Sequence, residues 1–158
     1  NAILRFASPA DMPAVLDLVR ELALYEKAPN EVTVTVDELI EDGFTKHLFT
    51  CIVAEAASAI VGMAFYYPRY STWKGKTIHL EDFVVKESFR GRGIGQMLFD
   101  AVVAEAEKFG AKRLEWLVLE WNEPALKFYK KVNATIDPEW HIGKLTEEQI
   151  RNYNVAMR

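Results

Sequence analysis

The segment Arg90-Gly91-Arg92-Gly93-Ile94-Gly95-Gln96 combines the residue types that bind an anion through the backbone. Its three glycines let the chain turn tightly, so that successive N–H groups converge at the positive end of the helix that follows. Arg90 and Arg92 add two cationic donors. We therefore expect a phosphate-bearing ligand here, although an unliganded turn between a strand and a helix is an open alternative.

The glycine spacing excludes two common phosphate-binding motifs from this segment. A dinucleotide fingerprint requires Gly-x-Gly-x-x-Gly, but Gln96 follows three residues after Gly93, and Leu98 follows three residues after Gly95. A P-loop requires Gly-Lys followed by Ser or Thr, and this segment contains no lysine. The phosphate therefore belongs to another class of ligand.

A second motif, Asn122-Glu123-Pro124-Ala125-Leu126-Lys127-Phe128-Tyr129, follows the glycine segment after one predicted strand. Helical spacing places its apolar residues on one face, so Tyr129 could be a packed core residue. A buried phenol still requires a hydrogen-bond partner for its hydroxyl group. The residues alone leave open whether Tyr129 packs or reacts.

Two adjacent carboxylates, Glu81 and Asp82, precede the glycine segment on a predicted strand. An alkylamine with a pKa near 10.4 arrives as an ammonium ion, and it must lose a proton before it can act as a nucleophile. Carboxylates attract such a cation and can accept its proton. Neighbours on a regular strand face opposite ways, so both serve one site only if the strand bulges or splays. An exposed Glu81 beside a backbone-bonded Asp82 is the structural alternative.

Composition and charge narrow the function further. The chain has 158 residues, half of them hydrophobic, and a net charge of −4, which argues against a nucleic-acid partner. Nine carboxylates against Arg20 and Lys27 make the stretch from Asp11 to Asp42 strongly acidic. This stretch is either a solvated helix surface or a field that attracts cationic small molecules.

The remaining reactive residues predict no further chemistry. Cys51 is the only cysteine and lies in an apolar strand pattern, so we expect a core residue and a reducing, cytoplasmic setting. The three histidines (His47, His79 and His141) are dispersed without metal-ligand spacing, so no metal is expected. The longest apolar stretch, Ile60–Tyr67, is far shorter than the ~20 residues of a membrane helix, and we expect neither membrane insertion nor export.

The hydrophobic pattern predicts a single domain over residues 1–158, an α/β fold with a mixed, mostly antiparallel sheet flanked by helices. The expected order is β-α-α-β-β-β-α-β-α-β with a C-terminal helix. Strands are expected at Ile3–Phe6, Phe49–Glu55, Ile60–Tyr67, Thr77–Val85, Arg113–Glu120 and Trp140–Leu145. Helices are expected after the cap at Ser8, from the capping box at Thr35 to Gly43, over Ile94–Phe109 and Pro124–Val132, and after the capping box at Thr146.

Both motifs resemble those of the GNAT superfamily of N-acetyltransferases. Arg90, Gly93 and Gly95 match its Arg-x-x-Gly-x-Gly pyrophosphate loop, and the second motif matches its Asn-x-x-Ala-x-x-Phe-Tyr helix. Within the superfamily, the chain is similar to the diamine (spermidine/spermine) N-acetyltransferase family from Arg5 to about Trp140. The stretches that carry this similarity are Leu24–Lys27, Leu39–Phe44, Tyr70–Lys76, Ile78–Phe83 and Leu119–Pro124. The run from Ser71 to Gly75 resembles the thialysine-acetylating branch, because the polyamine-preferring branch carries an acid where Ser71 stands.

The resemblance implies transfer of an acetyl group from acetyl-CoA to a primary amine of a small cationic substrate, by direct attack in a ternary complex. It implies a homodimer, and it assigns protonation of the departing thiolate to Tyr129 and water-mediated removal of the amine's proton to Glu81. Substrate contact is implied for Tyr25, Glu26, Trp73, Asp82 and Trp121. Cofactor contact is implied for Phe83, Val84, Val85, Arg90, Gly91, Arg92, Gly93, Ile94, Gly95, Gln96, Asn122 and Ala125.

Two other functions stay open at this point: acetylation of protein N-termini or lysines, and a CoA-binding module without turnover. A peptide substrate would require an open groove, whereas Trp73 and the acidic surroundings favour a short cationic chain. Trp73 and Trp121 could equally be packing residues. Among small amines, thialysine, lysine-like amino acids, putrescine and spermidine remain candidates.

Overall fold

The computed structural model describes residues 1–153 of the chain. Contacts divide the chain into two compact units, Asn1–Leu119 and Glu120–Arg158, which are described separately below. The single domain over residues 1–158 stays a prediction.

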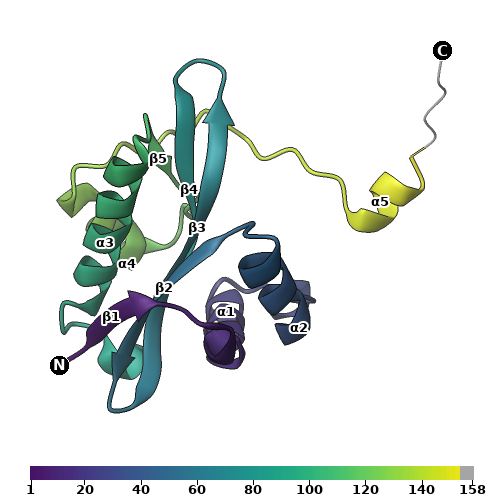
Figure 1. Cartoon of the computed structure of the whole chain (residues 1–158). Helices are drawn as coiled ribbons and strands as arrows, with labels where there is room; N and C mark the ends of the chain where they lie inside the picture. Colours follow the sequence, from purple (N-terminus) through teal and green to yellow (C-terminus); the bar gives the residue numbers. More distant parts are fainter. Residues whose placement is uncertain (154–158) are drawn as a thin grey trace. The chain divides into compact units, whose positions relative to one another are not determined.

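The first unit contains one five-stranded sheet, with the strands in the order of the sequence (Figure 1). The first four strands form an antiparallel meander, and the last is parallel to its neighbour. The bounds are β1 Ile3–Phe6, β2 Thr50–Ala56, β3 Ala59–Ser71, β4 Gly75–Val85 and β5 Leu114–Glu115. The predicted meander is confirmed, and β3 and β4 run beyond the predicted ends into a hairpin in which Ser71 pairs with Gly75.

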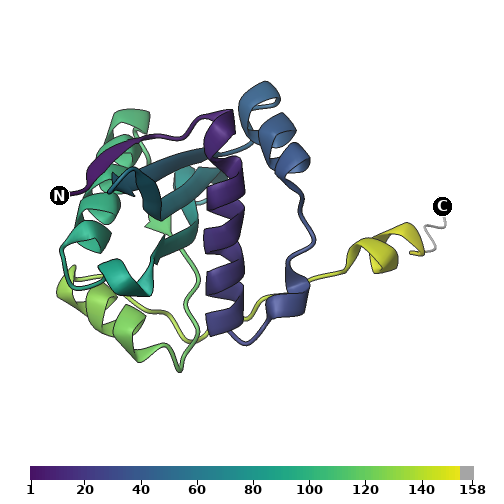
Figure 2. The same cartoon turned by 90° about the horizontal axis from the view of Figure 1, so that it is seen from below.

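Helices cover both faces of this sheet. Helix α1 (Met12–Tyr25) and the short α2 (Val36–Ile40) lie on one face, and α3 (Ile94–Phe109) lies on the other (Figures 1 and 2). The buried stripe of α1 packs against side chains of β2, β3 and β4. The residues of this core are Met12, Val15, Leu16, Leu18, Val53, Met63 and Val84. Burial of this stripe therefore fixes α1, and with it Tyr25 and Glu26, against the sheet.

The start of α1 is tied to β1 by a carboxylate. Asp11 accepts hydrogen bonds from Arg5 through Nη1 (2.7 Å) and Nη2 (2.9 Å), and from the Ser8 N–H (2.7 Å). The Arg5 guanidinium, followed by the Ser8 hydrogen bonds, holds the pKa of Asp11 well below its ordinary value. The residues between Ser8 and α1 form a short 3₁₀ turn, η1 (Pro9–Asp11).

Two further predicted element ends in the first unit are wrong. The second helix does not end at Gly43, because a π-helical turn, η3 (Glu41–Thr45), continues it. A Cβ at Gly43 would collide with the ring of Phe49, so this glycine permits close packing and does not terminate the helix. The predicted strand Arg113–Glu120 is reduced to β5, because pairing with β4 is limited to Ile78 and His79.

The second unit carries two helices among its described residues, α4 (Glu123–Lys131) and α5 (Glu147–Arg151). Each helix has a side-chain cap that accepts a backbone N–H of the first turn: Asn122 for α4, which the structure reveals, and Thr146 for α5, which the sequence predicts. The predicted strand Trp140–Leu145 is wrong: these residues are irregular and exposed. A strand requires a neighbour for its N–H and C=O groups, and no strand pairs with this segment within residues 1–153. No described helix is long and apolar enough to span a membrane.

Candidate active site

The glycine segment forms the turn between β4 and α3, after a short 3₁₀ turn, η4 (Glu87–Phe89). Gly91 (φ +73°) and Gly93 (φ +80°) have left-handed backbones, which side chains disfavour, and Gly93 is the N-cap of α3. A Cβ at either glycine would meet no atom within 4 Å. Their conformation therefore requires glycine, and the space beside the backbone is open to a ligand.

The start of α3 has the polarity that a diphosphate requires. The first N–H groups of a helix have no carbonyl partner in their own helix, and the helix dipole adds positive potential there. Arg90 donates from Nε to the Val85 carbonyl at 2.9 Å, which anchors its guanidinium at the end of β4. The Arg92 guanidinium lies 5.0 Å from the centre of the Phe89 ring. The donors present in this turn fit a diphosphate group.

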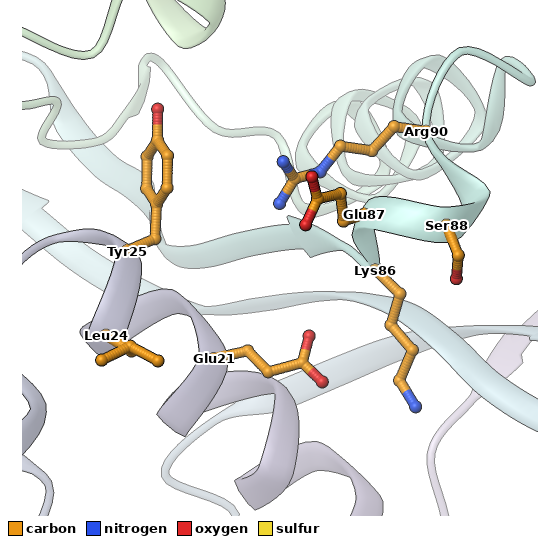
Figure 3. A pocket seen from close by; sticks show the side chains of 7 residues that line it. All are labelled: Glu21, Leu24, Tyr25, Lys86, Glu87, Ser88 and Arg90. Carbon is orange, nitrogen blue, oxygen red and sulfur yellow. The ribbon is translucent and has the colours of Figure 1, made fainter.

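A pocket of about 770 Å³ lies between the end of α1 and the turn that leads to the glycine segment (Figure 3). Its lining residues are Glu21, Leu24, Tyr25, Lys86, Glu87, Ser88 and Arg90. Tyr25 and Arg90 belong to the predicted site. Glu21 was not among the predicted site residues, although it lies one helical turn before Tyr25 and therefore shares its face. The pocket does not include Glu81 or Asp82.

A bulge in β4 places Glu81 and Asp82 on the same face of the sheet. Asp82 pairs with Phe65, but Leu80 pairs with Tyr66 and His79 with Tyr67, so Glu81 is the extra residue. Phe65 and Tyr67 share one face of β3. Their partners Asp82 and His79 share that face, and Glu81 joins them because it is two residues from His79. The bulge that the sequence analysis required for Glu81 and Asp82 to face one site is therefore present.

This face is the one that α1 covers. Phe65 packs against the core beneath α1, and the negative charge of Glu26, the residue after α1, acts on Asp82. Burial first, and then the charges of Glu81 and Glu26, raise the pKa of Asp82 to about 6. Burial also raises the pKa of Glu26. Three of the predicted catalytic and substrate residues thus form one carboxylate cluster, which attracts a cation.

The carboxylate of Glu81 is held by side chains of the same face. Tyr67 donates its hydroxyl proton to Oε2 of Glu81 at 2.8 Å, and Nε2 of His79 lies 3.4 Å from the same oxygen. Glu81 is nevertheless about half exposed. It is accordingly held in place and accessible to water.

After His79, β4 pairs with β3 on one side and has no neighbouring strand on the other among the described residues. Strand β5 pairs with Ile78 and His79 and with no later residue of β4 in the part of the chain that the structure describes. Backbone groups of an unpaired strand edge can pair with an extended ligand. The predicted cofactor residues Phe83, Val84 and Val85 lie on this stretch.

Trp73 lies apart from this cluster in the first unit. It lies in the turn of the β3–β4 hairpin, before Gly75, the first residue of β4. Glu81 is six residues further along that strand, which corresponds to roughly 20 Å. Ser71 closes this turn, because its Oγ accepts the N–H groups of Trp73 and Lys74 at 3.2 Å. The fold of the first unit by itself therefore does not place Trp73 beside Glu81.

The remaining predicted residues belong to the second unit. Tyr129 is the buried residue of α4, 6% exposed, and its ring contacts the Phe128 ring edge-on at 5.7 Å between centroids. Asn122 Oδ1 accepts the N–H of Ala125 at 3.3 Å, and Trp121 immediately precedes this cap. The predicted helix with a buried phenol is present, and the structure adds the Asn122 cap at its start.

Neither a metal centre nor a reactive thiol is found among residues 1–153. No group of three or more His, Cys, Asp or Glu side chains in that range could hold a metal ion. Cys51 is buried, and burial raises the pKa of its thiol to about 12. The thiol is thus protonated at neutral pH, as expected of a core residue.

Comparison with known proteins identifies the family. Residues 14–134 match the acetyltransferase (GNAT) family. A thialysine N-epsilon-acetyltransferase from Bos taurus is 38% identical over 161 residues, which cover 94% of this chain and 95% of that protein. The Sus scrofa thialysine N-epsilon-acetyltransferase is 36% identical over 163 residues, with 96% of each chain covered. Among solved structures, an integron cassette protein from V. cholerae superposes with a TM-score of 0.76 at 21% identity, over 95% of each chain.

The chain therefore belongs to the GNAT acetyltransferase family, and the predicted mixed α/β GNAT fold is confirmed. It is an acyltransferase enzyme whose reaction is the N-acetylation of an amine.

A stability prediction arises from the raised pKa of Asp82. The folded state binds this proton more tightly than the unfolded state, so ionisation of Asp82 costs stability as the pH rises from about 3.8 to about 6. Asp82→Asn removes that cost, and we expect it to stabilise the fold by about 1–2 kcal/mol at pH 7, or about 2–8 °C in Tm. Thermal unfolding between pH 3.5 and 7.5 measures this effect.

The matched control is Asp17→Asn, because Asp17 is exposed and pairs with Arg20 on the surface of α1. We expect it to change stability by less than about 0.5 kcal/mol. The stabilisation by Asp82→Asn should shrink below pH 6 and vanish near pH 3.8. A variant that is less stable than the native protein at pH 7 would contradict the buried, charge-repelled carboxylate.

Proposed function

We propose that this enzyme transfers the acetyl group of acetyl-CoA to a primary amine of a small cationic substrate, a thialysine-like amino acid first among the candidates. The bulge that brings Glu81 and Asp82 to one face, with Glu26 nearby, is the observation that carries the proposal. A cluster of carboxylates attracts an ammonium group and offers an acceptor for its proton. The names of the two mammalian relatives support the choice of amine.

The residues of the first unit fit acetyl-CoA as the cosubstrate, which supplies the activated acetyl group when bound. The backbone N–H groups from Gly91 to Gln96 bind the diphosphate, with Arg90 and Arg92 as further donors. The edge of β4 at Phe83, Val84 and Val85 binds the extended pantetheine arm. Asn122 and Ala125 are proposed as further contacts because they match the second motif.

Glu81 removes the proton from the amine, directly or through water. Its carboxylate is oriented by Tyr67 and is half exposed, so a water molecule can reach it. Asp82 and Glu26 attract the cation, and Tyr25, which lines the neighbouring pocket, contacts the substrate. Trp73 and Trp121 are proposed as substrate contacts on the resemblance alone. No metal takes part in this proposal.

Tyr129 protonates the departing thiolate. Its burial and its place in the capped helix of the second motif support this role. A neutral phenol can act as this acid, because its ordinary pKa of about 10 is close enough to the thiol value of about 8.5 that the proton transfer costs little.

The deciding experiment follows release of free thiol from acetyl-CoA with a panel of amines. Side-by-side kcat/KM values for thialysine, lysine, putrescine and spermidine identify the substrate class, and a peptide with a free N-terminus serves as the contrasting substrate. We expect thialysine to give the highest value and the peptide the lowest. Thiol release with the peptide alone, or with no amine at all, would overturn the proposal.

The diamine acetyltransferase resemblance further supports a homodimer that acts in the cytoplasm. Sedimentation equilibrium of the purified protein should give twice the 18.0 kDa chain mass. A monomer across micromolar concentrations would contradict the assembly and would leave the proposed chemistry unaffected.

The glycine loop yields a binding prediction. Gly93→Val places a β-branched residue at φ +80° and directs a side chain into the open space beside the turn. We expect acetyl-CoA affinity to fall by about 10-fold or more, measured by calorimetry. Gly93→Asn tolerates the left-handed backbone better and should lose affinity to a smaller extent.

Gly143→Val is the control, because Gly143 is exposed, has no atom within 4 Å of its Cβ position and has no positive φ. Both control and variant should unfold cooperatively. Undiminished acetyl-CoA affinity in both Gly93 variants would refute the role of the loop.

A further inference from the structure

Six polar side chains form a continuous line across β3, β4 and β5 on the face that carries Glu81. All lie in the first unit; five are strand residues, and Arg113 directly precedes β5. They are Tyr67, Arg69, His79, Glu81, Arg113 and Glu115. The proposed chemistry uses only Glu81 and its contact with Tyr67. His79, at the centre of the line, is buried and so far has no role.

Both neighbours of Glu81 in this line contact the same oxygen. Tyr67 donates to Oε2 at 2.8 Å, and Nε2 of His79 lies 3.4 Å from Oε2. Within this line, no side chain contacts Oε1. One carboxylate oxygen is thus anchored, and the other is available to water or to an amine.

Arg69 determines which nitrogen of His79 carries the proton. Nη1 of Arg69 lies 2.9 Å from Nδ1 of His79, and because a guanidinium has no acceptor, Nδ1 must accept this hydrogen bond. In a neutral imidazole the proton then resides on Nε2, which faces Glu81. Arg69 is itself held at 3.2 Å by Glu115, which also pairs with Arg113 at 3.2 Å.

Burial keeps the imidazole of His79 neutral, because the charges around the ring offset one another. Glu81 and Glu115 are negative, Arg69 and Arg113 are positive, and the Tyr67 ring stacks obliquely at 5.3 Å between centroids. These four charges balance. Burial, opposed by Glu81 and reinforced by Arg69, lowers the pKa of His79.

We propose that His79 is a positioning residue for acetyl transfer: as the neutral Nε2–H tautomer it donates to Oε2 of Glu81, so that Oε1 takes the proton of the amine. This inference rests on the proposed role of Glu81. The proton passes from the amine nitrogen to Oε1, directly or through one water, and His79 keeps its own proton throughout. A neutral donor orients the carboxylate without placing a full positive charge beside the base.

Kinetics of three variants test the proposal. His79→Phe keeps a ring and removes the donor; we expect kcat to fall about 10-fold, with the KM for acetyl-CoA within 2-fold of the native value. The acid limb of the kcat/KM profile should move to higher pH, because the ionised carboxylate has lost a donor. His79→Gln, whose amide N–H can replace Nε2–H, should recover most of both effects. Arg69→Leu should shift the same limb in the same direction, because the tautomer is no longer fixed.

A measurement without turnover tests the tautomer itself. Long-range ¹⁵N–¹H spectra of the ¹⁵N-histidine-labelled protein at pH 7, assigned by comparison with His79→Phe, should show His79 as the neutral Nε2–H form. An Nδ1–H tautomer or an imidazolium would overturn the inference. A native kcat and pH profile in His79→Phe would also overturn it, even where Glu81→Gln is inactive. Full turnover of Glu81→Gln would instead remove the proposed base, while the tautomer spectrum is read independently of it.

Discussion

Tyr129→Phe is expected to lower kcat by about 100-fold or more, because the variant keeps the ring and removes the proton that the departing thiolate requires. Tyr129 is the buried residue of α4, so the phenyl ring should pack in the same place. The acetyl-CoA dissociation constant should change by less than about 3-fold. Steady-state rates of thiol release, combined with calorimetry, separate the two quantities.

The control for this variant is Tyr153→Phe, an exposed tyrosine of the same unit. Its kcat should equal that of the native enzyme. A loss of stability in Tyr129→Phe would show as a lower Tm and would affect cofactor affinity as well as kcat. Native turnover by a folded Tyr129→Phe enzyme would eliminate Tyr129 as the acid.

Glu81→Gln is expected to lower kcat/KM for the amine by about 100-fold or more at pH 7, because an amide cannot accept the proton of the ammonium group. The amide oxygen can still accept the Tyr67 hydroxyl, so we expect the bulge to persist. The defect should narrow as the pH rises toward the pKa of the free amine, near 10.4 for a lysine-like substrate, because the neutral amine then needs no base. Rate profiles from pH 6 to 10 measure this convergence.

Glu107→Gln on the exposed surface of α3 is the matched control, and it should follow the native profile at every pH. A constant defect across this range would indicate that Glu81 acts through substrate binding alone. A native rate at pH 7 would exclude Glu81 as the base.

The parts of the fold that depend on neighbouring residues in the chain were predictable. Helix α3 begins and ends at the residues expected, Ile94 and Phe109, because the glycines on either side adopt positive φ angles that few other residues accept. The capping box at Thr146 acts over three residues and was equally evident. The glycine loop could likewise be recognised from the sequence, because its motif consists of adjacent residues.

The predicted strand at Trp140–Leu145 shows the limit of a local pattern. Trp140 and Ile142 are spaced as apolar residues of a strand, but the segment is irregular, because a strand also requires a partner. The predicted strand Arg113–Glu120 was too long for a related reason. The length of β5 depends on where β4 stops pairing with it, after His79.

The histidines illustrate the same limit within the site. The sequence indicated no metal-ligand spacing among them, and it gave no reason to connect His79 with Arg69 or Glu115. These residues are distant in the chain and become neighbours only through the pairing of β3, β4 and β5. The alternation of His79 with Glu81 was the one available signal, since residues two apart on a strand share a face.

Short-range features therefore sufficed for the family, the glycine turn and the helix ends, because backbone conformation and capping depend on adjacent residues. Whether Glu81 and Asp82 serve one site, and whether His79 supports them, depended on a one-residue shift in the pairing of β3 with β4. Strand register is a property of segments that meet only when the chain folds, and a shift of one residue reverses the face on which a side chain lies.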